Sequence, residues 1–230
     1  MTKSEGKSQN ISPEFVPALR FHWATNLYDG VMHYFTRDTL LRKLTIEAIN
    51  PTAGDKILDF GCGTGSLTEA LAKSNVPLSL TAYDIDPQVL EIAKGKIVDV
   101  VGVNQPFFKR VDLTDGSGVE VEALGSFDCI VSSLVFHHLD TDHKIAALKF
   151  ARQLLAEQGK VMLVDWGPGS NLLLKAAFLL VRAFDGFAVT RDNVQGRLPA
   201  MLASQGFTVK EATPLLNTMF GTIWLYIACR

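Results

Sequence analysis

The chain has 230 residues, of which 47% are hydrophobic and 20% are charged. This length suits one large domain or two small ones, and the composition argues against disorder over most of the chain. The 22 Lys and Arg residues nearly balance the 24 Asp and Glu residues, so the formal net charge is −2. A broad surface for nucleic acid or anionic membranes needs a clear excess of cations, and the charge therefore argues against both partners.

The first twelve residues, MTKSEGKSQNIS, are polar and contain no apolar signal core, so we expect a disordered tail. The longest apolar run, residues 172–184, is interrupted by Lys175 and Arg182 and is shorter than the about 20 residues that a membrane span needs. A cytoplasmic protein is expected. None of the three cysteines belongs to a C-x-x-C pair, which argues against structural zinc and a disulfide framework.

Residues 13–50 have helical apolar spacing and many aromatic side chains, and we interpret them as an N-terminal helical cap. Short apolar strands then alternate with amphipathic helices. Asp86 is the expected N-cap of the second of these helices, with Pro87 in its first turn. The alternation predicts a parallel sheet with helices on both faces. The strands are expected at residues 56–60, 78–83, 107–111, 127–132 and 161–164, and the helices at 66–73, 87–97 and 143–155. The run Glu157-Gln158-Gly159 is expected to end the last of these helices.

The pattern changes after Trp166. Helices are expected at residues 171–184 and 194–205, the second ended by Gly206. Strand-like runs at 207–214 and 222–229 follow without a long helix between them, which predicts an antiparallel hairpin at one edge of the sheet. We interpret residues 13–230 as a single α/β domain in which residues 166–205 form an insertion.

The strongest local signal is the run DFGCGTG at residues 59–65, between the first strand and the helix that follows it. Open α/β sheets bind ligands at the carboxyl ends of their strands, and glycines let the backbone approach a ligand where a Cβ would collide. A tight structural turn is the alternative. The position of the run, with Asp59 before its glycines, favours ligand binding.

Two further acids follow the next two strands. Asp84 comes 19 residues after Gly65, the spacing of an acid that accepts both hydroxyls of an adenosine ribose. A capping or turn role is the alternative for Asp84, although Asp86 fits capping better. Asp112 either accepts from the exocyclic amine of adenine or is an ordinary loop acid. Together these positions predict an adenosine-containing cofactor.

The charge of Asp59 distinguishes between two such cofactors. NAD is bound by a G-x-G-x-x-G loop whose helix amides face a pyrophosphate, whereas this loop reads G-x-G-x-G with a carboxylate two residues before its first glycine. That carboxylate would repel a pyrophosphate and would suit an ammonium group. S-adenosylmethionine (SAM) carries an ammonium and a sulfonium and no phosphate, so SAM is the predicted cofactor.

Four segments resemble the motifs of the class I SAM-dependent methyltransferases, in order and at the usual spacing: ILDFGCGTGSLTEAL, AYDIDPQVLEIAK, FDCIVSSLVFHHL and LLAEQGKVMLVDWG. The resemblance covers about residues 25–230, and there is a faint likeness to the quinone-biosynthesis C-methyltransferases. It implies a Rossmann-like, seven-stranded sheet in the order 3-2-1-4-5-7-6 with strand 7 antiparallel. It also implies SAM as methyl donor and S-adenosylhomocysteine (SAH) as product.

The resemblance assigns cofactor roles to single residues. Asp59 and the glycines after it match the motif around the methionine part of SAM, Asp84 matches the ribose acid, and Asp112 matches the adenine-side acid. Tyr28 looks like the tyrosine that some relatives fold over SAM. The expected cofactor-binding set is Tyr28, Asp59, Gly61, Cys62, Gly63, Gly65, Asp84, Ile85, Asp112, Leu113, Ser132 and Ser133.

Methyl transfer from a sulfonium is an in-line displacement, so the protein mainly supplies proximity, orientation and exclusion of water. His137 matches a position where relatives place active-site residues, and its imidazole could accept a proton or orient the acceptor. Asp165 follows the fifth strand at the same edge and is a second catalytic candidate. Packing and turn roles are the alternatives. Neither His137 nor His138 has a Cys or carboxylate at metal-ligand spacing, so no metal is expected.

The acceptor is predicted only by class. No N-P-P-Y or D-P-P-Y run follows the fourth strand, which argues against amino methylation of nucleic-acid bases. Residues 166–205 are apolar, and apolar residues inserted after the fifth strand usually line the acceptor pocket in the family that the sequence resembles. This favours a small, hydrophobic acceptor, and burial of the segment against the sheet is the alternative. The competing functions are a non-catalytic SAM-binding regulatory subunit and an RNA-modifying methyltransferase that acts with a partner.

Overall fold

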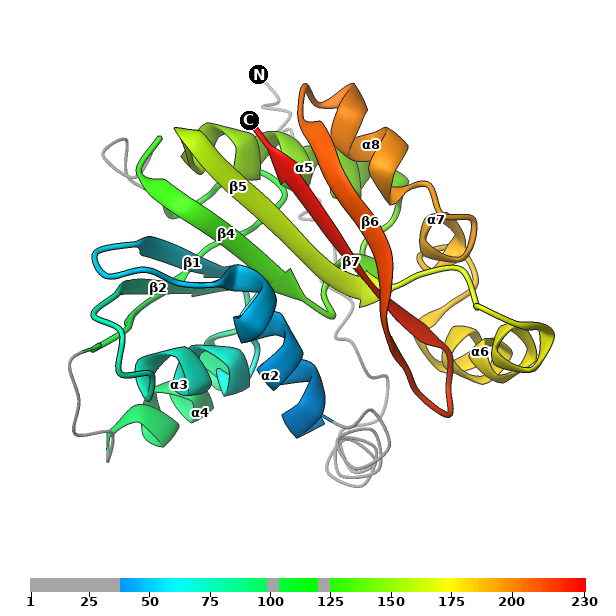
Figure 1. Cartoon of the computed structure of the whole chain (residues 1–230), viewed down its shortest axis with the longest axis horizontal. Helices are drawn as coiled ribbons and strands as arrows, with labels where there is room; N and C mark the ends of the chain where they lie inside the picture. Colours follow the sequence, from blue (N-terminus) through cyan, green and yellow to red (C-terminus); the bar gives the residue numbers. More distant parts are fainter. Residues whose placement is uncertain (1–37, 99–103, 120–124) are drawn as a thin grey trace, which may run out of the picture.

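The computed structural model describes residues 38–98, 104–119 and 125–230, which contain one seven-stranded sheet flanked by helices (Figure 1). The strands are β1 (Lys56–Phe60), β2 (Ser79–Asp84), β3 (Phe107–Arg110), β4 (Phe127–Ser133), β5 (Leu155–Trp166), β6 (Thr208–Asn217) and β7 (Thr222–Cys229). Their order is β3-β2-β1-β4-β5-β7-β6. Only the pairs that involve β7 are antiparallel among these described strands. The order and the direction of β7 confirm the predicted fold.

Three of the described helices, α4, α5 and α6, begin at short polar side chains that cap them. Asp86 accepts a hydrogen bond from the Gln88 N–H and Pro87 follows it, as predicted, and Asn171 caps a later helix by accepting from the Leu174 N–H. In the part of the chain that is described, no helix has both the length and the apolar character that a bilayer crossing requires. The helices are α2 (Asp38–Ile49), α3 (Ser66–Ala72), α4 (Pro87–Ile97), the 3-10 helix η2 (Phe136–His138), α5 (Thr141–Leu154), α6 (Leu172–Asp185), α7 (Arg191–Val194) and α8 (Leu198–Ser204).

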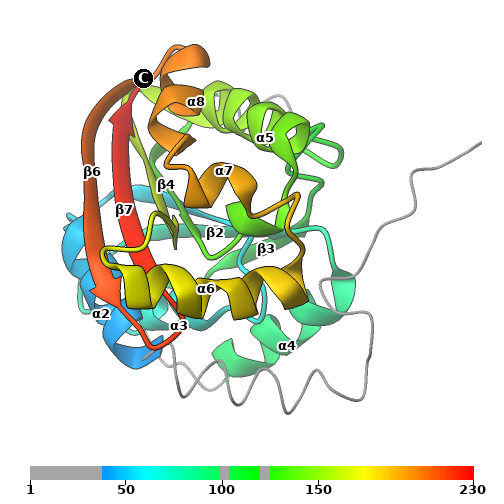
Figure 2. The ribbon, with the colours of Figure 1, turned by 90° about the vertical axis from the view of Figure 1, so that its right-hand side faces the viewer.

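Successive residues of the central strands point to opposite faces of the sheet, and each face has its own apolar core. Leu58 of β1 and Ile130 of β4 belong to the core that contains residues of α5 and α8. Ile57 and Val131, one position along the same strands, belong to the core that contains residues of α2, α3 and α6. Figure 2 shows α8 beside α5, and α6 crossing the lower part of the view. Both faces of the central strands are therefore buried, as a parallel sheet requires.

β5 begins earlier than predicted. The sequence places a helix end at residues 157–159, but α5 ends at Leu154 and Leu155 is already extended and paired with Phe127 of β4. Gly159 lies inside the strand, where a Cβ would be 2.8 Å from the Phe127 carbonyl oxygen. The glycine thus permits a close approach between two strands, and pairing with β4 decides the structure of this segment.

The helix expected at residues 194–205 begins later than predicted: α7 ends at Val194, and α8 covers Leu198–Ser204. Gly196 lies between them with a φ of +65°. Pro199 stands in the first turn of α8, a position that its ring allows, whereas a helix that began at residue 194 would place the ring in the helix interior. The expected N-terminal cap is described only from Asp38 onward, and Tyr28 and the tail lie outside the described residues.

Candidate functional site

The loop after β1 lies at the carboxyl edge of the sheet, where the end of β2 holds it. The backbone N–H groups of Gly61 and Cys62 both donate to the Tyr83 carbonyl oxygen over 2.9 Å. The Gly63 N–H donates to the Asp84 carboxylate over 2.8 Å. Three successive peptide groups are therefore fixed against β2, which gives the loop one defined shape.

Asp84 binds backbone with both of its carboxylate oxygens. Its second oxygen accepts from the Asp86 N–H over 3.0 Å. Burial raises the pKa of Asp84, while the N–H groups of Asp86 and Gly63 act in the opposite direction. A carboxylate offers about four acceptor positions, so two remain for other donors. This geometry fits an acid that also accepts two hydroxyls of a ribose.

Two glycines of the loop have different surroundings, although both have a positive φ, +52° at Gly63 and +75° at Gly65. A Cβ at Gly65 would lie 2.6 Å from the Ala93 Cβ, so this glycine allows α4 to pack against the loop. A Cβ at Gly63 would meet no atom within 4 Å. Gly63 therefore presents bare backbone to open space, as a cofactor cradle does.

Asp59 lies beneath the loop and is 3% exposed. One of its carboxylate oxygens accepts from the Thr68 hydroxyl of α3 over 2.6 Å. Burial raises the pKa of Asp59 from 3.8 to about 6; the Thr68 bond lowers it, and the charge of Asp84 adds to the rise. A cation bound at the loop would favour the ionised carboxylate. Thr68 is not among the predicted site residues. Its position in the first turn of α3 is the only signal in the sequence that it contacts Asp59.

Several other residues of the expected cofactor set make local contacts. Burial raises the pKa of the Cys62 thiol, so this group stays protonated at neutral pH. The Asp112 Oδ1 accepts from both the N–H and the hydroxyl of Thr114 in a turn. The Ser132 hydroxyl donates to the Phe60 carbonyl oxygen over 2.7 Å and so connects β4 with β1. The remaining positions are buried or half-buried: Ile85, Leu113 and Ser133.

The structure brings His137 and Asp165 together as a buried pair at the ends of β4 and β5. Their exposed fractions are 4% and 1%. The His137 Nδ1 lies 2.8 Å from the Asp165 Oδ1, and the His137 N–H donates to Oδ2 over 3.3 Å. Asp165 also accepts from the Trp166 N–H and the Asn193 side-chain amide. With its Nδ1 held by Asp165, His137 leaves Nε2 as its second ring nitrogen, which is not bound by Asp165.

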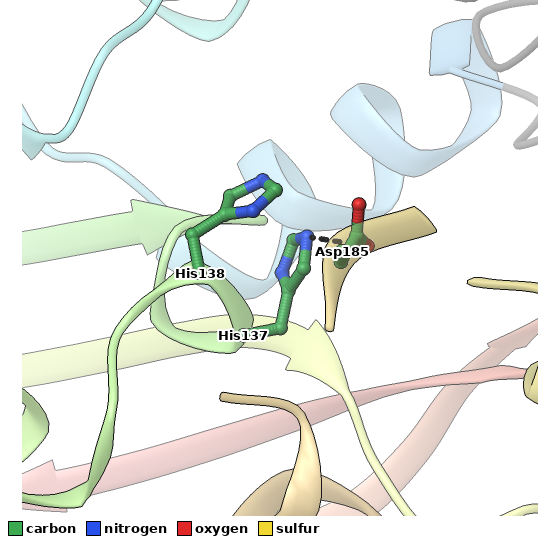
Figure 3. A group of neighbouring side chains, drawn as sticks. All are labelled: His137, His138 and Asp185. Carbon is green, nitrogen blue, oxygen red and sulfur yellow. Dashed lines mark ion pairs between the residues drawn. The ribbon is translucent and has the colours of Figure 1, made fainter. Parts of the chain in front are cut away.

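Asp185, at the end of α6, lies on the other side of the His137 ring (Figure 3). Its Oδ2 is 3.7 Å from the His137 Nε2. Burial lowers the pKa of His137, but the charge and hydrogen bond of Asp165 and the charge of Asp185 together outweigh burial and raise it. Asp185 is not among the predicted site residues, since its only signal in the sequence is that of an acid at the end of an apolar helix.

The ring of His138 packs against that of His137, with 3.9 Å between the ring centroids. The side chain is accessible to solvent, yet protein surrounds it on most sides. This desolvation, with the charges of His137 and Lys144, lowers the pKa of His138 well below its ordinary value. His138 is therefore a neutral imidazole at neutral pH.

A buried lysine fixes the segment that carries Asn193. The Lys144 side chain is fully buried, its Nζ donates to the Val189 carbonyl oxygen over 2.5 Å, and it lies 3.9 Å from the Asp192 carboxylate. Burial lowers the pKa of Lys144, and the charge of Asp192 opposes that effect. These contacts hold α7 against α5 and so place Asn193 beside Asp165.

Two surface hollows lie elsewhere on the molecule. One is formed by α5, the end of α8 and the C-terminus, and the other by α2 and α3. Neither is lined by Gly63, Asp84 or His137. The candidate site is therefore defined by the hydrogen-bonded loop and the buried histidine, and not by either of these surface hollows.

Comparisons with known proteins agree with this geometry. The model of a family described as "methyltransferase domain" matches residues 58–161. An uncharacterized methyltransferase of Bacillus mycoides (strain KBAB4) is 34% identical over 121 residues, 52% of this chain and 50% of that protein. A relative described in the same words from Bacillus anthracis (strain A0248) has the same identity and coverage. The chain spans about half the length of these curated relatives.

Solved methyltransferase structures share the fold. A SAM-dependent methyltransferase from Methanosarcina mazei has a TM-score of 0.63 at 20% identity, covering 80% of this chain and 96% of that one. The magnesium protoporphyrin IX methyltransferase of Synechocystis PCC 6803, solved with bound SAH, has a TM-score of 0.65 at 21% identity, covering 89% and 88%. The sheet order matches the fold of these solved methyltransferases, and residues 58–161 are similar to a methyltransferase domain.

Proposed function

We propose that the chain transfers a methyl group from SAM to a small, hydrophobic acceptor. The proposal is carried by Gly63, whose backbone faces open space at the end of β1 while its N–H is bound by Asp84. β1 lies between β2 and β4, where the strand order reverses direction. Open α/β sheets bind nucleotide cofactors at this switch point.

The charges around the loop favour SAM over a dinucleotide. Asp59 lies beneath the loop and Asp84 beside it, so a pyrophosphate here would meet two carboxylates, whereas the ammonium and sulfonium of SAM would be attracted. Bound SAM would supply an activated methyl group. Asp84 would accept from its ribose hydroxyls, and the Asp112 Oδ2 would accept from its adenine amine, since the turn at Thr114 uses Oδ1.

His137 is the proposed acceptor-side residue. Asp165 takes up Nδ1, so Nε2 is the atom that could meet an acceptor, either to accept its proton or to hold it in place. Asp165 acts as a positioning residue, because its oxygens bind the ring and backbone of His137, the Trp166 N–H and the Asn193 amide.

The exposed face of α6 supports an apolar acceptor. α6, which ends at Asp185, and the turn after it carry large apolar side chains that solvent reaches, and a cluster of this kind marks a binding surface more often than scattered exposed residues do. The magnesium protoporphyrin IX methyltransferase, by its name, combines this fold with a small-molecule substrate. The exposed apolar residues are Leu172, Leu173, Leu179, Leu180, Phe184 and Phe187.

Calorimetry with the purified chain tests the cofactor. SAM and SAH are expected to bind and NAD is not, because only NAD brings a pyrophosphate to Asp59. Binding of NAD, or failure of both SAM and SAH to bind, would overturn the proposal. A panel of thiol, phenol, amine and quinone compounds then tests the acceptor, with release of SAH as the readout and a reaction without acceptor as the control.

A further inference from the structure

Three side chains from two distant parts of the chain converge near the ends of β4 and β5 (Figure 3). His137 and His138 come from η2, and Asp185 comes from the end of α6. One ligand atom of each lies within 4.8 Å of the other two, and the His137 Nε2 is 3.7 Å from the Asp185 Oδ2. Ligand atoms around a tetrahedral ion with bonds of about 2.0–2.2 Å are about 3.3–3.6 Å apart. Small side-chain rotations therefore close this group on one ion.

The surroundings of His137 are those of a metal-bound histidine. Such a histidine almost always gives its other ring nitrogen to a carboxylate or carbonyl, which fixes the ring. Here the Nδ1 is 2.8 Å from the Asp165 Oδ1 and can donate its proton there, and Nε2, 3.7 Å from the Asp185 Oδ2, is the nitrogen left for a metal ion. Asp165 is itself fixed by the Trp166 N–H and the Asn193 amide. One ligand is thus held in place before an ion arrives.

We propose that His137, His138 and Asp185 bind a divalent transition-metal ion, with Asp165 orienting His137. Two imidazole nitrogens suit Zn²⁺ and its neighbours in the first row, whereas Mg²⁺ and Ca²⁺ prefer oxygen ligands. Three protein ligands leave a position for water or for another ligand. The sequence argued against a metal because no carboxylate lies at ligand spacing from the histidines, and the fold supplies Asp185 from a remote helix.

The alternative is an ion pair in which protonated His137 lies between Asp165 and Asp185. Such a pair would account for His137 but not for His138, whose ring centroid is 3.9 Å from that of His137. A second imidazole adds nothing to the attraction between an imidazolium and two carboxylates. A shared metal ion accounts for both rings and for Asp185.

This site goes beyond the proposed function and does not require it. The group lies where the acceptor is proposed to bind. With an ion bound, the His137 Nε2 is a metal ligand instead of a proton acceptor, and the open position of the ion would coordinate an oxygen or sulfur atom of an acceptor. Metal binding is nevertheless measurable without SAM and without an acceptor.

The test is a calorimetric titration of the EDTA-treated chain with Zn²⁺, and with Mg²⁺ for comparison. We expect one Zn²⁺ per chain and no binding of Mg²⁺. His138→Ala and Asp185→Asn should each weaken Zn²⁺ binding about tenfold or more, as loss of a ligand or its support does. His143→Ala is the matched control, because His143 also lies 2.9 Å from a carboxylate, that of Asp140, but on an exposed part of α5. It should bind Zn²⁺ as the wild type does.

Absence of Zn²⁺ binding, or equal binding by the His138→Ala and His143→Ala variants, would overturn the proposal. Thermal unfolding of the metal-free variants checks that each is folded. If Asp185→Asn does not fold, the result for His138→Ala decides the test, because the His138 side chain is exposed. Titration of the same samples with SAH separates the two proposals. SAH binding without Zn²⁺ binding rejects only the metal site, and Zn²⁺ binding without SAH binding rejects only the proposed cofactor.

Discussion

The N–H of Gly63 and the carboxylate of Asp84 are joined by a 2.8 Å hydrogen bond between the loop after β1 and the end of β2. The same carboxylate also accepts from the Asp86 N–H. Asp84 thereby shapes the loop while keeping lone pairs for a bound ligand. One side chain links the structure of the loop to the proposed grip on a ribose, so its removal should affect cofactor affinity strongly.

Asp84→Ala is expected to weaken SAM binding by about 1.5–3 kcal/mol, the scale of a lost charge-assisted hydrogen bond. Calorimetry with SAM or SAH measures the change. Asp86→Ala is the matched control two residues away. It removes the cap that accepts from the Gln88 N–H, so it should lower the free energy of unfolding by about 0.5–2 kcal/mol and leave cofactor affinity nearly unchanged. Unchanged affinity in Asp84→Ala would mean that the ribose is held elsewhere.

The two loop glycines should respond differently to alanine. In Gly65→Ala the new methyl group would lie 2.6 Å from the Ala93 Cβ, so overpacking should cost about 1–3 kcal/mol in the free energy of unfolding, in addition to the cost of the left-handed backbone that both variants share. In Gly63→Ala the methyl group meets open space, and the left-handed backbone costs only about 1–2 kcal/mol. That methyl group would, however, occupy the space proposed for SAM.

Urea unfolding and SAH calorimetry of both variants separate these effects. Relative to its loss of stability, Gly63→Ala should lose more affinity for SAH than Gly65→Ala does. A folded Gly63→Ala variant that binds SAH as tightly as the wild type would show that the open space at this glycine is not the cofactor cradle.

The sequence predicted those parts of the fold that local signals determine. Asp86 and Pro87 mark the start of α4 because capping and proline geometry act within one turn. Gly159 was predicted to end a helix because glycine commonly terminates helices. It is a strand residue instead, and the approach of the Phe127 carbonyl oxygen of β4 to within 2.8 Å of its Cβ position explains why a glycine is needed there. That approach is a tertiary contact, which a local pattern does not contain.

The candidate site divides in the same way. The loop acids were predicted because parallel strands end at one edge, so Asp59 and Asp84 had to lie near each other. Asp185 was not predicted, because its place beside His137 depends on how α6 crosses the end of the sheet (Figure 2). Its position follows from the packing of Phe178 and Val181 of α6 into the core.

The burial of Asp59 predicts a pH-dependent stability. The folded chain holds the Asp59 proton more tightly than the unfolded chain, since burial raises the pKa to about 6 from 3.8. From about pH 4 to pH 6 the folded state therefore binds more protons, and stability falls as pH rises through this range and is level above it. A shift of this size corresponds to about 3 kcal/mol.

Asp59→Asn should remove this part of the pH dependence, because the amide does not ionise but still accepts from Thr68. The variant should be more stable than the wild type near neutral pH and similar to it near pH 4, as measured by urea unfolding at both. Asp115→Asn is the control. The Ser117 hydrogen bonds lower the pKa of the exposed Asp115. The ionised Asp115 carboxylate therefore adds to stability, so Asp115→Asn should change stability in the direction opposite to Asp59→Asn. If the free energy of unfolding of Asp59→Asn depends on pH as that of the wild type does, Asp59 is not the source of the pH dependence.

His137→Gln should lower turnover more than it lowers cofactor affinity. The hydrogen bonds that hold Gly63 and Asp84 do not involve His137, whose Nδ1 is bound by Asp165, so SAH calorimetry should change little. Turnover, followed as SAH release with any acceptor that the panel identifies, should fall about 10²–10⁴-fold if Nε2 takes part in proton transfer. His143→Ala, on the exposed part of α5, should match the wild type in both measurements. Equal losses in turnover and affinity would place His137 beside the cofactor, and an unchanged turnover would make the His137–Asp165 pair a packing feature.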